Sequence, residues 1–324
     1  MTIDVSVIPV QRQATLSRSI ECEGVSLHGG QNVRLVLKPA PVNTGIVFVR
    51  VDVSCIENHI AVRADAVTDV KRCTTISNMA GIQVSTIEHL MAAFSAVGID
   101  NLTIEIDGPE LPALDGSAEP FLRLIEQAGI VSQPEPRRYI KVLKPVEVQI
   151  GDAYARIDPY SCLYLDVTIN FTEAAIGLQR IEIEPDVKTF RERMASARTF
   201  ARAHEVVALR EAGLSLGGSY DNAIVVDGSK VLNPGGLRFA DEFVRHKALD
   251  LLGDMYIGGP LLGRVTTIRG GHALNHQLLL ALFADSKAWK FTHLATAQKM
   301  PKTKLESVSG LEGVSGLEET VSPL

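Results

Sequence analysis

Two clusters of histidine and carboxylate side chains in this sequence could carry chemistry, and the first has the spacing of metal ligands. His246 and Asp250 lie four residues apart in a segment with helical periodicity, residues 241–256, so an imidazole and a carboxylate would stack one turn apart and reach a single cation. Lys247 and Asp254 share their narrow polar arc, and apolar residues cover the rest of the helix. A solvated helix face is the alternative. Because unpaired buried charges are costly, the narrow arc favours a cavity opposite these residues.

The second cluster is Glu88 and His89, near the start of a helix predicted at residues 85–97. The pattern Ser85-x-x-Glu88 is typical of a capping box, which alone would account for the glutamate. Small side chains at positions 92, 95 and 96 would leave room for another element to pack beside the pair. From these residues alone, a helix cap and a functional carboxylate both remain open.

A third candidate is His272, which follows the glycine pair Gly270-Gly271. Residues 262–268 predict a strand, and apolar periodicity from residue 274 predicts a helix, so the glycines would form a sharp turn between them. The positive end of the helix dipole would tend to lower the pKa of this histidine. A turn with a capping histidine is the alternative.

Strand and helix signals are segregated along the chain, which favours α+β layers over a doubly wound sheet. In the first part, apolar alternation predicts strands at residues 33–37, 46–51 and 101–107. Helical periodicity predicts helices at residues 85–97 and 117–128. In the second part the order repeats loosely, with strands at 139–150, 154–159 and 163–171 and helices at 186–197 and 241–256. We therefore predict two similar α+β domains, each a sheet layered with helices.

The clearest linker is the proline-rich segment at residues 132–136, because two prolines with polar neighbours interrupt both helices and strands. We place an N-terminal domain at residues 1–133 and a C-terminal domain at residues 137–295. Residues 201–227 have no counterpart in the first domain and are predicted to be an insertion that carries function. Residues 300–324 are rich in Lys, Ser, Gly and Glu, which predicts a disordered tail.

Composition excludes several classes of function. The chain has 324 residues, 46% hydrophobic and 22% charged, a balance typical of globular proteins. Its net charge of -6 includes no basic block, which argues against nucleic-acid binding. No stretch reaches the roughly 20 apolar residues that span a bilayer, and the first residues lack a secretory signal, so we expect a cytoplasmic location. The four cysteines, at positions 22, 55, 73 and 162, are unevenly spaced and are predicted to be reduced thiols.

Together these segments resemble the UDP-3-O-acyl-N-acetylglucosamine deacetylases, a family of zinc enzymes of bacterial lipid A biosynthesis. The resemblance runs from about residue 15 to residue 291. It rests on short motifs that occur in the family's order: Gly24-Val25-Ser26-Leu27-His28, Cys73-Thr74-Thr75, Ser85-Thr86-Ile87-Glu88-His89-Leu90, Leu114-Asp115-Gly116-Ser117-Ala118, Ala197-Arg198-Thr199-Phe200, His246-Lys247-x-x-Asp250-x-x-x-Asp254 and Gly271-His272-Ala273-Leu274-Asn275.

The resemblance implies two similar α+β domains with the active site at their interface. The family's zinc ligands fall on His89, His246 and Asp250. The family's general base falls on Glu88 and its general acid on His272. The hydroxyl that stabilises the oxyanion falls on Thr199, and two supporting residues fall on Lys247 and Asp254. The cofactor implied is Zn²⁺.

The substrate that the resemblance implies is UDP-3-O-acyl-N-acetylglucosamine. Hydrolysis of its N-acetyl group gives acetate and UDP-3-O-acyl-glucosamine, the committed step of lipid A biosynthesis. Phe200 is expected to contact the substrate, and Arg269 to bind its diphosphate. The insertion at residues 201–227 would form a passage for the acyl chain, with apolar lining from Val206, Val207 and Leu209. We expect a monomer.

Two departures from the family pattern leave the preferred acyl chain open. Ala201-Arg202 stands where the family often has Gly-Phe, and Lys71-Arg72 stands where more apolar residues are expected. Two other classes of protein are alternatives to a zinc hydrolase. A metal-free binding protein with this fold would lack a ligand or the base, and all are present. Non-haem iron oxygenases also use two histidines and one carboxylate, but on a double-stranded β fold, which helical ligand spacing disfavours.

Overall fold

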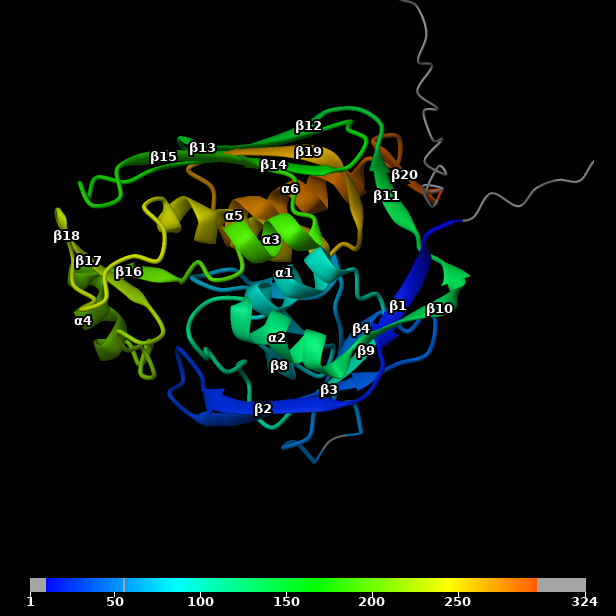
Figure 1. Cartoon of the computed structure of the whole chain (residues 1–324), viewed down its shortest axis with the longest axis horizontal. Coiled ribbons are helices and arrows are strands. Elements are labelled where there is room, and N and C mark those ends of the chain that lie inside the picture. The colour runs from blue at the N-terminus through cyan, green and yellow to red at the C-terminus, as the bar shows by residue number, and fades with distance from the viewer. Residues whose placement is uncertain (1–9, 55, 296–324) are drawn as a thin grey trace, which may run out of the picture.

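The computed structural model describes residues 10–54 and 56–295, which form four layers (Figure 1). One sheet from the N-terminal half and one from the C-terminal half form the outer layers, and helices of both halves pack between them. Each sheet therefore buries one face against helices. The predicted α+β fold is confirmed. The predicted tail at residues 300–324 and Cys55 lie outside the described residues.

The N-terminal half contributes a five-stranded sheet in the order β2-β3-β9-β4-β5. Its elements are β2 (Ile20–Val25), β3 (Asn32–Pro39), β4 (Ile46–Arg50), β5 (His59–Ala61), α1 (Glu88–Val97), β9 (Leu102–Ile106) and α2 (Glu119–Ala128). Alternate side chains of β3, Val33, Leu35 and Leu37, are buried, as the period-two pattern of that strand predicts. β9 lies parallel to β4 and antiparallel to β3.

The C-terminal half repeats this arrangement. Its elements are β11 (Tyr139–Val142), β12 (Val146–Ile150), β13 (Ala153–Asp158), β14 (Leu163–Asn170), β15 (Leu178–Ile183), α3 (Val187–Arg193), α5 (Glu242–Tyr256), β19 (Leu261–Ile268), α6 (His272–Ala284) and β20 (Trp289–Thr292). β19 lies antiparallel to β13 and parallel to β14, while β12 and β15 flank them. This pairing matches that of the first half, so α1 and α5 occupy equivalent places before the central strands β9 and β19.

Three smaller sheets complete the structure. They contain β1 (Arg12–Leu16) with β10 (Ile130–Pro136); β6 (Val67–Asp69), β7 (Thr75–Ser77) and β8 (Gln83–Val84); and β16 (Phe200–Arg202), β17 (Ile224–Asp227) and β18 (Lys230–Val231). Helix α4 (Ala203–Glu211) lies between β16 and β17, so the predicted insertion folds as a small α/β unit at one end of the molecule (Figure 1).

The proline-rich segment is a strand, not the irregular linker that the sequence predicts. β10 pairs with β1 and includes Pro134 and Pro136. Proline has no backbone N–H to donate within a sheet. Both prolines are tolerated here because the sheet has only two strands, so one edge of each strand forms no hydrogen bonds with another strand. The domain limits at residues 133 and 137 therefore remain a prediction.

Of the two interpretations of Glu88, the structure excludes the capping box. The helix begins at Glu88, with Ile87 as the preceding residue and no side-chain cap. The Ser85 hydroxyl instead donates to the carbonyl of Pro109 at 3.1 Å. The Glu88 carboxylate accepts a hydrogen bond from the backbone N–H of Thr74 at 3.0 Å. This carboxylate is therefore free of the helix terminus and faces the residues described below.

Two further predictions concern the chain as a whole. Cys22, Cys73 and Cys162 carry free thiols, as predicted. Within the two described ranges, no helix is long and apolar enough to cross a bilayer.

At one point, helices α1 and α5 are in direct backbone contact, with no side chain between them. A Cβ atom placed on Gly253 of α5 would lie 2.0 Å from the backbone oxygen of Glu88 in α1. No residue other than glycine fits there unless one helix moves. The close approach brings the first turn of α1 beside the middle of α5, where the candidate ligands lie.

We expect Gly253→Ala to lower the free energy of unfolding by about 1–3 kcal/mol, the usual cost of forcing extra atoms into a packed core. It should also reduce metal occupancy, because the helices must separate. Chemical denaturation and metal analysis measure the two effects. Gly235→Ala is the matched control, since a Cβ there meets nothing within 4 Å. Equal stability of the two variants would contradict this account of the helix contact.

Candidate metal centre and catalytic site

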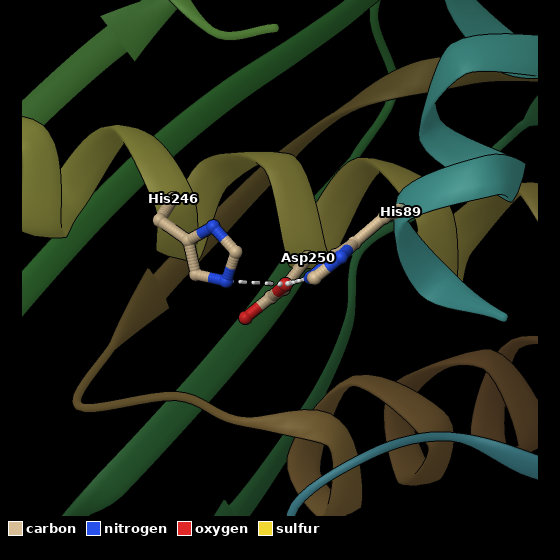
Figure 2. A group of neighbouring side chains, drawn as sticks. All are labelled: His89, His246 and Asp250. Carbon is tan, nitrogen blue, oxygen red and sulfur yellow. Dashed lines mark ion pairs between the residues drawn. The ribbon is translucent and has the colours of Figure 1, made fainter. Parts of the chain in front are cut away.

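His89, His246 and Asp250 converge from two helices on one point (Figure 2). The Nε2 atoms of His89 and His246 lie 3.5 Å and 3.3 Å from the same oxygen, Oδ1 of Asp250. Ligand atoms around a tetrahedral zinc ion lie roughly 3.3 Å apart, given metal–ligand distances near 2 Å. Within the described ranges, no other group of three His, Cys, Asp or Glu side chains brings its ligand atoms this close.

The environment of these three side chains fits a bound cation. All three are buried, and Oδ1 of Asp250 has no hydrogen-bond partner among the described residues. Its other oxygen, Oδ2, accepts from Nζ of Lys247 at 2.8 Å. The Nδ1 atom of His246 lies 3.0 Å from the carbonyl of Ala197, which acts as the acceptor and leaves Nε2 as the free ligand atom. A divalent ion would satisfy the buried oxygen.

Glu88 and His272 face each other beside the ligands. Nε2 of His272 lies 4.0 Å from Oε1 of Glu88, and both side chains are buried. On its other side, the His272 ring lies 2.9 Å from Oδ2 of Asp254 through Nδ1. Asp254 therefore fixes the ring orientation and leaves Nε2 directed toward Glu88. The pair has the form of a base and an acid that can both reach one reacting group.

Two residues that the sequence interpretation did not assign a role hold this pair in place. Thr74 precedes β7; its N–H donates to Glu88, and its hydroxyl donates to Oδ1 of Asp254 at 2.6 Å. Asn275 of α6 donates its side-chain N–H to Oδ2 of Asp254 at 2.8 Å. Both residues lie in motifs that carry the family resemblance, but their partners come from distant elements, so no local pattern indicates their roles.

These groups open into one cavity of about 710 Å³. Its lining includes the three ligands, the Glu88–His272 pair, Lys247 and Thr199. The cavity continues beneath α4, where its wall is largely apolar and includes Phe171, Phe200, Val206, Val207, Leu209 and Leu232. The predicted apolar lining from the insertion is therefore present in the geometry.

A family model described as UDP-3-O-acyl N-acetylglycosamine deacetylase matches residues 13–284 of the chain. The chain belongs to this family. Its relatives include the UDP-3-O-acyl-N-acetylglucosamine deacetylase of Phenylobacterium zucineum, which is 49% identical over 82% of this chain and 92% of that protein. The protein of the same name from Stenotrophomonas maltophilia (strain K279a) is 47% identical over 86% of this chain and 93% of that protein. The one from Idiomarina loihiensis is 44% identical over 86% of this chain and 92% of that protein.

The surroundings shift the pKa values of three buried groups, His246, Glu88 and His272, away from their ordinary values. Burial lowers the pKa of His246 to about 3, so its ring is neutral and free to ligate. Burial raises the pKa of Glu88, which makes this carboxylate a stronger base. Burial alone would lower the pKa of His272, but the neighbouring Asp254 carboxylate outweighs it and raises the pKa to about 9. The lowering expected from the helix dipole is therefore wrong.

The other predicted site residues are placed differently with respect to the cavity. Phe200 lines it and packs edge-on against Phe171 and Phe243, at centroid distances of 5.5 and 5.1 Å. Arg269 is exposed and pairs with Asp152 at 3.6 Å, and it does not belong to the lining. Its role in diphosphate binding remains a prediction with no support from this geometry.

The departures from the family pattern form an ion-pair chain on the cavity wall. Arg202 pairs with Glu205 at 2.5 Å and with Glu173 at 3.5 Å. Arg72, from the N-terminal half, lies 4.0 Å from the same glutamate, Glu205. Charged groups therefore replace part of the apolar wall that the family pattern predicts.

Proposed function

We propose that this deacetylase hydrolyses the N-acetyl group of UDP-3-O-acyl-N-acetylglucosamine to give acetate and UDP-3-O-acyl-glucosamine, the committed step of lipid A biosynthesis. The observation that carries the proposal is the convergence of His89, His246 and Asp250 beside the buried Glu88 carboxylate. Family membership supplies the substrate, since the relatives are named for it.

The metal that best fits the ligands is Zn²⁺. Two imidazole nitrogens and one carboxylate oxygen form a set that zinc hydrolases use with a fourth position left open. When bound, the ion supplies a Lewis acid that lowers the pKa of a ligated water toward 7 and polarises the substrate carbonyl. Lys247 neutralises the second oxygen of Asp250, so the carboxylate presents one oxygen to the ion.

Glu88 is the proposed general base. Its carboxylate takes a proton from the attacking water as that water adds to the acetamide carbonyl. The raised pKa of Glu88 favours this transfer, and the Thr74 N–H holds the carboxylate in place. The Thr199 hydroxyl, on the cavity wall, donates to the oxyanion that forms, a contribution of about 3–4 kcal/mol for one donor in comparable sites.

His272 is the proposed general acid. An amine is a poor leaving group until its nitrogen is protonated, and Nε2 of His272 lies 4.0 Å from Oε1 of Glu88, close enough for both groups to reach the same amide. Asp254, at Nδ1, stabilises the protonated ring. The apolar part of the cavity beneath α4 would take the acyl chain and exclude water from it. The cytoplasmic location and the monomeric state remain predictions from the sequence.

The proposal is tested by acetate release from UDP-3-O-acyl-N-acetylglucosamine with the purified protein. We expect release to stop when a chelator removes the metal and to return when Zn²⁺ is added, because the proposed reaction needs the ion that His89, His246 and Asp250 would hold. Magnesium serves as the control ion, since it prefers an octahedral shell of oxygen ligands. Undiminished release from protein shown by metal analysis to be metal-free would reject the metal-dependent mechanism.

The pairing of His272 with Asp254 leads to a prediction on pH. With a pKa raised to about 9, His272 is protonated at lower pH, and activity should fall as pH rises through that value. In Asp254→Asn the negative charge is lost, and burial then lowers the pKa of His272. The alkaline limb of kcat/KM against pH should therefore move to lower pH. An unmoved alkaline limb would remove His272 from the acid role or Asp254 from its support.

A further inference from the structure

The proposed mechanism does not use a buried ion pair at the start of the metal-binding helix. Glu242 lies in the first turn of α5 with 0% of its side chain exposed, and Arg198 is 10% exposed. The carboxylate accepts from Nε of Arg198 at 2.9 Å and from the backbone N–H of Arg198 at 3.0 Å. A buried ion pair is weak evidence for stability, because desolvation offsets its attraction. A role other than stability is therefore sought for the Glu242–Arg198 ion pair.

Arg198 lies at the centre of a short segment, residues 197–199, which we call the strap. The carbonyl of Ala197 accepts from Nδ1 of the ligand His246 at 3.0 Å. Glu242 and His246 are one turn apart on α5, so the strap is attached to that helix at two successive turns. Its third residue, Thr199, lines the cavity.

The strap also rests on a turn from the N-terminal half. The N–H of Thr199 donates to the carbonyl of Gly116 at 2.8 Å. Gly116 has φ +78°, and a Cβ there would lie 1.8 Å from the backbone oxygen of Asn222, so this turn also packs directly against the backbone that precedes β17. Arg238 strengthens the contact, because it donates to Asp115 of this turn at 2.9 Å.

We propose that Glu242 is a positioning residue for the reaction: through Arg198 it fixes the strap so that the Thr199 hydroxyl is held at the cavity wall. The inference rests on the proposed oxyanion role of Thr199. The hydroxyl has no hydrogen bond of its own within the described residues that would orient it, so its place is set by the backbone on either side. Backbone contacts hold Thr199 itself, and the Glu242–Arg198 pair holds the residue before it.

This assignment predicts which kinetic constant changes. Donors that stabilise a transition state act only when they are already in position, and a shift of roughly 1 Å can lower the rate by about 100-fold. Glu242→Gln retains the shape of the side chain but weakens the hold on Arg198, while Ala197 and Gly116 still retain the strap. We expect kcat to fall by about tenfold and KM to change by less than about threefold.

The experiment is a double-mutant cycle with Thr199→Val, which removes the hydroxyl and keeps the shape of the side chain. If Glu242 acts through Thr199, Glu242→Gln should lower kcat by less than about twofold in the Thr199→Val background. Metal content and melting temperature are measured for every variant. Asp241→Asn is the matched control, because Asp241 pairs with Arg245 at the same end of α5 and does not contact the strap.

The outcomes separate this inference from the proposed function. Thr199→Val with the parental kcat would remove the oxyanion role of Thr199, and this inference with it. A slow Thr199→Val combined with an equal Glu242→Gln loss in both backgrounds would reject only the positioning role. A folded Glu242→Gln with parental kcat would reject it as well. If Glu242→Gln does not fold, Arg198→Lys replaces it in the same double-mutant cycle and is judged by the same criteria. Arg198→Lys keeps the positive charge but loses the planar guanidinium group.

Discussion

Replacing Glu88 by glutamine is expected to leave the bound metal in place and to lower kcat by a factor of about 10²–10⁴, the usual contribution of a general base. Glutamine has nearly the same shape, and its side-chain oxygen can still accept the N–H of Thr74. It cannot take a proton. The chemical step therefore loses its base while the three ligands keep their positions. Steady-state kinetics and metal analysis of the same preparation test both parts.

The control for Glu88→Gln is Glu126→Gln, which makes the same chemical change on the partly exposed helix α2. This control should retain the parental kcat. Near-normal turnover of Glu88→Gln would remove Glu88 from the base role. Loss of metal in Glu88→Gln would instead indicate that this carboxylate supports the ligands.

Asp250→Ala should have the second large effect, on metal affinity. Oδ1 of Asp250 is the atom toward which both histidine nitrogens point, and Lys247 would face two imidazoles with no negative charge between them. Loss of a residue that only supports a metal ligand costs about 10–100-fold in metal affinity, so loss of a ligand should cost at least about 100-fold. We expect substoichiometric zinc after gel filtration and almost no acetate release at ordinary zinc concentrations.

Asp241→Asn, in the same helix but away from the ligands, should retain full metal content. Full zinc occupancy in Asp250→Ala would show that another carboxylate completes the site. Restoration of activity to this variant at high zinc concentration would fit the prediction, because it places the defect in affinity.

The proximity of His246 and Asp250 could be predicted from the sequence because their arrangement is local. The spacing of His246 and Asp250 places both on one helix face, and the narrow polar arc indicates that this face meets a cavity. For Glu88 the residues alone left a helix cap and a functional carboxylate open, and the structure shows no side-chain cap at this helix end. The repeated order of strands and helices predicted two similar units, and the matching strand pairing confirms it.

Other features depend on contacts between distant elements, which no local pattern encodes. The raised pKa of His272 comes from Asp254, which α5 brings beside the start of α6. Thr74 contributes a backbone N–H, a group that every residue except proline has. The capping box failed because the Glu88 side chain turns away from its own helix end toward the cavity.

The contact between α1 and α5 ties metal capture to the order of synthesis. The N-terminal half, made first, offers one imidazole, which is too few ligands to hold a divalent ion tightly. The high-affinity set exists only after the second half is complete and Gly253 has docked against the backbone of Glu88. A chain that lacks the second half would therefore bind a divalent ion only weakly, and tight binding would require that both halves have assembled.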